Sequence, residues 1–202
     1  MTKVNNISPV GTELYFLPVE TRVPLKFGPE TLTAVTCARV KMQVKSSDGN
    51  LFEGWGETPL SVQWVWPSQL TYHERHEVLK DFCIHLAKAW GEFDAQGHAL
   101  EVGHAFQKEV LPALLEELNR NRPEAAEMPW LAALVCCSAF DIALHDAYGL
   151  ANQVPVYQTY GKPYMKADLA HYLQPAQGSG ISFGGKYPLD FLQTSPPTRL
   201  PA

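Results

Sequence analysis

The apolar segment around residue 140 carries the side chains best suited to proton transfer. Asp141 and His145 are four residues apart, so a helix would place them on one face, and Asp146 follows directly. A histidine beside a carboxylate can act as an acid–base pair in catalysis. The same spacing also fits a buried hydrogen bond that packs the helix against a neighbouring part of the protein.

Metal-capable side chains gather at the start of a predicted helix. They are His73, Glu74, His76 and Glu77. A histidine pair three residues apart can bind zinc, but no third ligand is evident. Acidic residues in a first turn instead suit the positive end of the helix dipole. We therefore predict a solvated helix start, and the same interpretation applies to His98 and His104.

Two further groups of residues are candidates for a functional role. Trp64, Trp66 and Tyr72 can line a substrate loop, or they can form a hydrophobic plug between strands and helices. The segment Gly178–Gly185 is rich in glycine, but no strand precedes it and it lacks the Lys-Ser or Lys-Thr ending of a phosphate-binding loop. We expect a mobile loop or an insertion there.

The strands that must position these groups lie in the first third of the chain. Glu13–Val19 and Ala34–Lys45 are rich in strand formers, and the second alternates apolar with polar residues. Ser47–Asn50 is a turn signal, and Leu51–Glu57 follows as the partner strand. We predict an antiparallel meander with one solvated face. The stretch Thr21–Thr33, with its prolines and glycine, is expected to be a loop.

Helical periodicity dominates the middle of the chain. Thr71 and Glu74 have the spacing of a capping box, and an apolar stripe runs from there to Gly91, where the helix is expected to end. The next apolar repeat, Val102–Leu118, contains Pro112. Proline lacks an N–H and crowds the preceding turn, so it should kink or split this helix.

The segment Trp130–Ala151 is apolar nearly all round and is expected to be buried on most sides. A module of three strands and three helices would bury less of this segment than its apolar character requires. The segment is therefore expected to pack against a large surface of the same protein or of a second chain. Residues 163–202 are rich in glycine and proline and show no helical period, so we expect an irregular tail. We interpret this end as a chain cut short, or as half of something larger.

Composition narrows the class of protein. The 202 residues are 46% hydrophobic and 18% charged, which is typical of a globular chain. The net charge of −5 and the scattered Lys and Arg disfavour nucleic acid and anionic membranes as partners. We find no signal peptide and no run approaching the length of a bilayer, and so expect a cytoplasmic protein. The spacing of the cysteines indicates buried, reduced thiols.

Three motifs follow one another along the chain. Gly54–Pro59 matches a G-x-G-E strand, and Ser138–Gly149 matches a helix of pattern A-x-D-x-A-x-x-D. Asn152–Gly161 matches a G-x-P-x-x-x-L-L-G-G segment, with Asn152 and Lys162 at positions that usually hold glycine. In this order they resemble the N-terminal capping domain of the enolase superfamily, of the mandelate racemase and muconate lactonizing type, and its lead-in to the barrel.

This resemblance implies a two-part enzyme. A capping domain covers the substrate, and a β/α barrel supplies metal ligands and acid–base residues at the ends of its strands. Family members abstract a proton next to a carboxylate and stabilise the enolate on Mg²⁺. The residues after Gly161 hold no Lys-x-Lys and no spaced Asp/Glu series. We therefore assign no catalytic residue and no metal ligand, and expect the implied Mg²⁺ to be bound outside this chain.

The resemblance also assigns two substrate-covering loops by position, Thr21–Thr31 and Glu57–Trp64. The candidate substrate contacts in them are Arg22, Lys26, Phe27, Thr58 and Trp64. The family uses the Ser138–Gly149 helix for packing, so the resemblance favours a buried hydrogen bond as the role of Asp141 and His145.

The predicted fold class is α+β, with a three-stranded antiparallel meander, a helical bundle and an irregular C-terminal tail. We divide the chain into a capping domain (1–130), a buried helix with the lead-in to a barrel (131–162), and a tail or truncated barrel start (163–202).

Two classes of function stay open. The first is the capping portion of an isomerase, racemase or lyase that acts on a small carboxylate by metal-assisted α-proton abstraction. It would be catalytically incomplete in this chain and would work as a homo-oligomer or with a barrel-bearing partner. The second is a stand-alone binding or structural module without catalysis, and a truncated product without activity is a further alternative.

Overall fold

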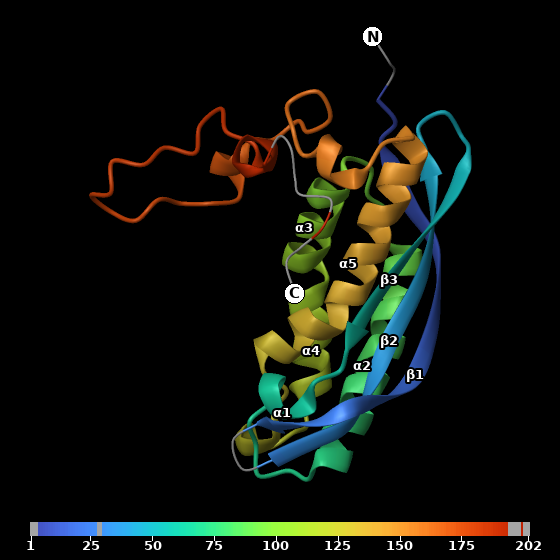
Figure 1. Ribbon diagram of the computed structural model, residues 1–202, viewed down its shortest axis with the longest axis vertical. Helices are drawn as coiled ribbons and strands as arrows, with labels where there is room; N and C mark the ends of the chain where they lie inside the picture. Colours follow the sequence, from blue (N-terminus) through green and yellow to red (C-terminus); the bar gives the residue numbers. More distant parts are fainter. Residues whose placement is uncertain (1–3, 28–29, 194–198, 200–202) are drawn as a thin grey trace.

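Strand-forming residues in the N-terminal third build one antiparallel sheet (Figure 1). The computed structural model describes residues 4–27, 30–193 and 199, and of Phe27 and Glu30 it describes the backbone alone. The strands are β1 (Ile7–Phe27), β2 (Glu30–Ser46) and β3 (Leu51–Pro59). They lie in the order β1-β2-β3, and both pairs are antiparallel. The predicted meander and α+β class are confirmed.

The predicted loop Thr21–Thr33 is wrong, because β1 and β2 continue through most of it as a hairpin. The register shifts between Glu20 and Leu25, and the shift takes up Pro24. Proline cannot donate to a ladder, so in sheets it is confined to edges and irregular positions. Since β1 is an edge strand, the chain passes Pro24 and pairs again as far as Phe27.

Helices cover one face of this sheet. They are α1 (Val62–Val65), α2 (Tyr72–Glu92), α3 (Ala99–Glu109), α4 (Leu111–Asn119) and α5 (Trp130–Asn152). α2 and α5 pack against the strands, while α3 and α4 contact those two helices (Figure 1). The core therefore lies mainly between the sheet and the α2–α5 pair, with α3 and α4 closing its far side.

Local signals predicted the helix boundaries well. Thr71 caps α2 as a capping box, because the Glu74 amide donates to its hydroxyl and its own amide donates to the Glu74 carboxylate at 2.8 Å. The helix ends at Glu92, one residue after Gly91. The expected break at Pro112 is confirmed, since α3 ends and α4 begins on either side of Val110.

β3 lies directly on the backbone of α5. A Cβ atom on Gly54 would come within 2.2 Å of the Ala143 carbonyl and the Ala147 amide nitrogen. One on Gly56 would come within 2.1 Å of the Ala139 carbonyl. Glycine on the strand and alanine on the helix therefore let the two backbones touch, and we call this the β3–α5 contact.

A motif carboxylate fastens the same contact from the side. The amide of Trp55 donates a hydrogen bond of 2.9 Å to Asp146 Oδ2. β3 is an edge strand, so this N–H has no ladder partner and a side chain satisfies it instead. This hydrogen bond thus joins the G-x-G strand to Asp146, the second aspartate of the helix motif.

The apolar character of α5 follows from its central place. Within Glu124–Asn152, a segment of 18 residues has a mean hydropathy of 1.5, so this helix is long and apolar enough to cross a membrane and the expectation that no such run exists was wrong. Half of that segment is buried inside the protein, as in a core helix. The four cysteines are buried and free, as predicted.

The described part of the tail, residues 163–193, is irregular, as expected. Two short turns interrupt it, η3 (Leu169–His171) and η4 (Pro188–Phe191), and the glycine-rich segment between them projects beyond the helices (Figure 1). Glu101, in the first turn of α3, fixes its beginning, because one carboxylate oxygen accepts from the amides of Lys166 at 2.7 Å and Ala167 at 3.1 Å.

Candidate functional site

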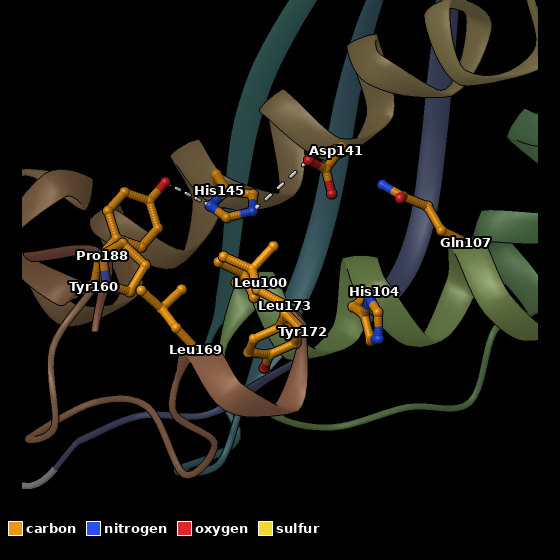
Figure 2. A pocket seen from close by; sticks show the side chains of 10 residues that line it. All are labelled: Leu100, His104, Gln107, Asp141, His145, Tyr160, Leu169, Tyr172, Leu173 and Pro188. Atoms are coloured by element: carbon orange, nitrogen blue, oxygen red, sulfur yellow. Dashed lines mark hydrogen bonds and ion pairs between the residues drawn. The ribbon is translucent and has the colours of Figure 1, made fainter. Parts of the chain in front are cut away.

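A cavity of about 400 Å³ lies between α3, α5 and the tail (Figure 2). We call it the tail cavity. α3 and α5 provide its polar wall, and the segments around η3 and η4 provide most of its apolar wall. The lining residues are Leu100, His104, Gln107, Asp141, His145, Tyr160, Leu169, Tyr172, Leu173 and Pro188.

The start of α3 is set by a buried histidine. His98 is the N-cap, and its Nδ1 accepts a hydrogen bond of 3.0 Å from the Leu100 amide. Its Nε2 lies 3.2 Å from the hydroxyl of Thr159. Burial, with a smaller effect of nearby His145, lowers the pKa of His98 to about 4. The expected solvated position of His98 is wrong, because the whole residue is buried.

Asp141, His145 and Tyr160 form the polar centre of the site (Figure 2). The Tyr160 hydroxyl lies 2.8 Å from His145 Nδ1, and His145 Nε2 lies 3.8 Å from Asp141 Oδ2. The second distance fits an ion pair but is too long for a hydrogen bond. The predicted same-face pair is therefore present, while the hydrogen bond of His145 is made to Tyr160.

Burial disfavours charge on this pair. It raises the pKa of Asp141 and lowers that of His145, and the charge of each partner offsets part of the other's shift. Asp141 can come close to α3 because Gly103 lies opposite, where a Cβ would be 2.2 Å from Asp141 Oδ1. Burial also raises the pKa of Tyr160 to about 12, so its hydroxyl stays protonated. Asp141, His145 and Tyr160 together can hold and exchange protons.

Two polar atoms of the site have no partner among the described residues. They are Nε2 of His104 and the hydroxyl of Tyr172, and both atoms are buried. Their rings meet edge to face with centroids 4.9 Å apart. Burial also lowers the pKa of His104, although the residue as a whole is only partly buried. Unpaired buried polar atoms usually mark a place where water or a ligand binds.

The candidate substrate contacts lie elsewhere. Arg22 and Lys26 are exposed on the β1–β2 hairpin, and the side chain of Phe27 lies outside the described residues. Trp64 is 53% exposed on α1, whereas Thr58 is buried and its hydroxyl lies 2.7 Å from that of Ser138. Figure 1 shows the hairpin end and α1 at one end of the sheet and the tail at the other.

Trp64 and Trp66 lie in different environments, and only Trp66 fits the predicted hydrophobic plug between strands and helices. Trp66 is buried in the core, and its carbonyl accepts a hydrogen bond from the buried Arg75, so it serves as a plug. Trp64 faces solvent, while the ring of Tyr72 stacks on His76.

The described residues do not fit the magnesium ion that the motif resemblance implies. Within residues 4–27, 30–193 and 199, no group of three or more His, Cys, Asp or Glu could hold a metal ion. Mg²⁺ also prefers a shell of oxygen ligands, whereas Asp141 is accompanied by an imidazole and a phenol. His76 Nε2 lies 2.9 Å from the Thr36 hydroxyl, so the first turn of α2 does not present a free histidine pair.

The tail's share of the site was missed from the sequence. Leu169, Tyr172 and Leu173 lie in a stretch without periodicity, and they meet α3 and α5 from far along the chain. No local pattern signals such a contact. The aromatic residues and leucines within a glycine-rich tail were the one available hint, since solvated loops rarely need them.

Comparison with known proteins gives matches to solved structures alone. No protein-family model matches the chain, and no curated protein matches it. Similar structures include a dipeptide epimerase from Cytophaga hutchinsonii complexed with Mg and a dipeptide (19% identity, TM-score 0.44), which covers 80% of this chain and 35% of that one. A mandelate racemase/muconate lactonizing enzyme-like protein from Rubrobacter xylanophilus has 19% identity and a TM-score of 0.40 with the same coverage.

A third match, L-talarate dehydratase from Polaromonas sp. JS666 complexed with Mg and L-glucarate, has 10% identity and a TM-score of 0.41, covering 77% of this chain and 35% of that one. This chain spans about a third of the length of the structures it matches.

Proposed function

We propose that this chain is the substrate-capping part of an enolase-superfamily isomerase, racemase or lyase. The β3–α5 contact carries the proposal. Gly54 and Gly56 let the strand touch the helix backbone, and Asp146 binds the free amide of Trp55. Residues of two of the three sequence motifs thus join the strand to the helix.

In this function the end of the molecule with the hairpin and α1 would cover a small carboxylate. Arg22 and Lys26 are exposed there and offer positive charge to an anion, and Trp64 offers an apolar surface. A barrel on a partner would supply Mg²⁺ and the base. The division at residues 130 and 162, a cytoplasmic location and a homo-oligomeric or barrel-bound assembly belong to the same proposal.

The test measures exchange of the α-proton of carboxylates with D₂O by NMR, using a dipeptide, mandelate and glucarate in the presence of Mg²⁺. The chain is assayed alone and after co-expression with an enolase-superfamily barrel domain supplied as a separate chain. We expect exchange from the co-expressed pair and none from either chain alone. Magnesium-dependent exchange by this chain alone, or failure of the two chains to assemble, would contradict the proposal.

Variants of the active pair test the covering end. Replacing Arg22 and Lys26 together by glutamine should raise KM for an anionic substrate about tenfold, with little change in kcat, because a charge-assisted contact to bound substrate is lost. Lys88→Gln, an exposed lysine on α2, is the matched control and should leave both constants unchanged.

A second candidate is a stand-alone binding module, and one observation favours it. Trp55, Ile142 and Tyr157 are 46%, 46% and 65% exposed and border one cavity of about 360 Å³. Adjacent exposed apolar side chains mark interaction surfaces. Binding of a partner that lacks a barrel through this face would favour the module over the capping part.

A further inference from the structure

We propose that the tail cavity binds a small organic cation that consists of an ammonium group on an apolar, preferably aromatic, body. This site is independent of the substrate-covering end, which lies at the opposite end of the sheet (Figure 1).

The charge of the cavity points to a cation. Asp141 lines it, and its side chain keeps 31% of its surface exposed. None of the described residues that line it is a lysine or an arginine. If the protonated Tyr160 hydroxyl donates to His145 Nδ1, the imidazole is neutral and its other nitrogen carries the hydrogen that faces Asp141. A cation bound beside Asp141 favours the ionised carboxylate and so offsets the effect of burial on its pKa, and Asp141 is the one carboxyl group among the described lining residues.

Neutral polar atoms are placed to orient such a ligand. The amide of Gln107 points toward Asp141 across the opening (Figure 2). His104 Nε2 and the Tyr172 hydroxyl are buried without a partner among the described residues, and both residues line the cavity. A ligand that reaches them would satisfy hydrogen-bonding groups that otherwise remain unpaired at a cost in free energy.

The remaining wall suits an apolar body. Leu100 and Leu169 supply aliphatic surface, and Tyr160 and Tyr172 supply ring faces that attract cations. A cavity of about 400 Å³ lies at the lower end of the range for small-molecule sites.

Hydrogen bonds within the chain hold this wall in place. Glu101 holds the tail at Lys166 and Ala167, and the Leu189 amide donates to the Tyr160 carbonyl at 2.9 Å. A preformed site avoids the ordering cost of a loop that folds around its ligand.

The test titrates the ¹⁵N-labelled full chain with three probes of similar shape: 2-phenylethylamine, protonated at pH 7.5, neutral 2-phenylethanol and anionic phenylacetate. We expect saturable amide shifts in α3, α5 and the tail, with the amine binding about tenfold more tightly than the alcohol, as one charge-assisted contact would give. Phenylacetate should bind more weakly than both.

Two variants and a control locate the site. Asp141→Asn should remove the preference for the amine, and Asp81→Asn, an exposed aspartate on α2, should keep it. Leu173→Trp, from a tail position that is 45% exposed, should fill the cavity and abolish binding without disturbing the core. Near-UV circular dichroism verifies folding of each. Equal affinity for amine and alcohol, unchanged preference in Asp141→Asn, or no saturable binding would overturn the proposal.

Discussion

Single residues decide how closely the layers of this protein approach. Gly54 and Gly56 alternate along β3 and face the alanines of α5, so the strand rests on the helix backbone rather than on side chains. Backbone atoms cannot rotate away as a flexible side chain can. Neither position therefore has room for the methyl group of an alanine.

Gly56→Ala should destabilise the fold by about 1–3 kcal/mol, the usual cost of overpacking, because its Cβ would collide with the Ala139 carbonyl. Urea unfolding measures the change. Gly91→Ala is the matched control, since no atom lies within 4 Å of the added carbon and alanine favours the helix, so it should stabilise by up to about 1 kcal/mol. Equal effects of the two substitutions would contradict the β3–α5 contact.

His98 is a residue-scale source of acid sensitivity. Its pKa in the folded state is about 4, below its ordinary value of 6.5. Between these values the unfolded chain binds a proton that the folded chain does not, so stability falls as the pH falls from 6.5 to 4. The expected loss is roughly 2–3 kcal/mol.

Urea unfolding at pH 7, 5.5 and 4.5 checks this sign against a variant. His98→Asn keeps an N-cap acceptor for the Leu100 amide but cannot titrate, so its stability should depend less on pH over this interval. His85→Asn, an exposed histidine on α2, should retain the wild-type dependence. A wild-type slope in His98→Asn would mean that other groups cause the acid sensitivity.

At the scale of elements, α3 organises the end of the molecule that holds the tail cavity. Its first turn contains the buried cap His98 and the carboxylate of Glu101, which accepts from the tail. The break between α3 and α4 lies at Val110, next to Pro112, and it lets the two helices pack against the core separately. α3 thus fixes the position of the irregular tail.

Glu101→Ala should release the tail while leaving the sheet and α5 folded. The amides of Lys166 and Ala167 lose a charged acceptor, so their hydrogen exchange should accelerate about tenfold or more. Glu109→Ala, at the exposed end of the same helix, is the control and should leave those rates unchanged. Unaltered exchange in Glu101→Ala would show that the tail is held by other contacts.

At the scale of the whole molecule, one face keeps apolar side chains exposed. Trp55, Ile142 and Tyr157 border one cavity, and Leu150, 51% exposed, borders a neighbouring one. We call this surface the α5 face. The binding-module candidate uses it, and a second copy of the chain or another partner would cover it.

The α5 face predicts self-association of the isolated chain. The sedimentation coefficient should rise with protein concentration, and Ile142→Lys combined with Leu150→Lys should abolish the rise. Since both side chains are about half exposed, the double variant should keep most of its stability. Lys substitutions at the exposed Val23 and Leu25 of the hairpin serve as control. A concentration-independent monomer would contradict self-association through this face.

Local patterns along the chain predict three strands followed by helices, and they predict the boundaries of the helices better than those of the strands. The capping box at Thr71 and the break at Pro112 depend on neighbours within a few positions of the chain, so local patterns contain them. The meander was readable for the same reason, because alternation along Ala34–Lys45 reflects one buried face.

Packing between distant segments determines which of these elements face one another and which polar groups lose contact with water. Pro24 continues a strand because β1 happens to be an edge, and His98 is buried because α5 and Thr159 cover it. The tail cavity joins α3, α5 and the tail across long stretches of chain. Burial and contact between distant segments are properties of packing, so no local pattern of residues encodes them.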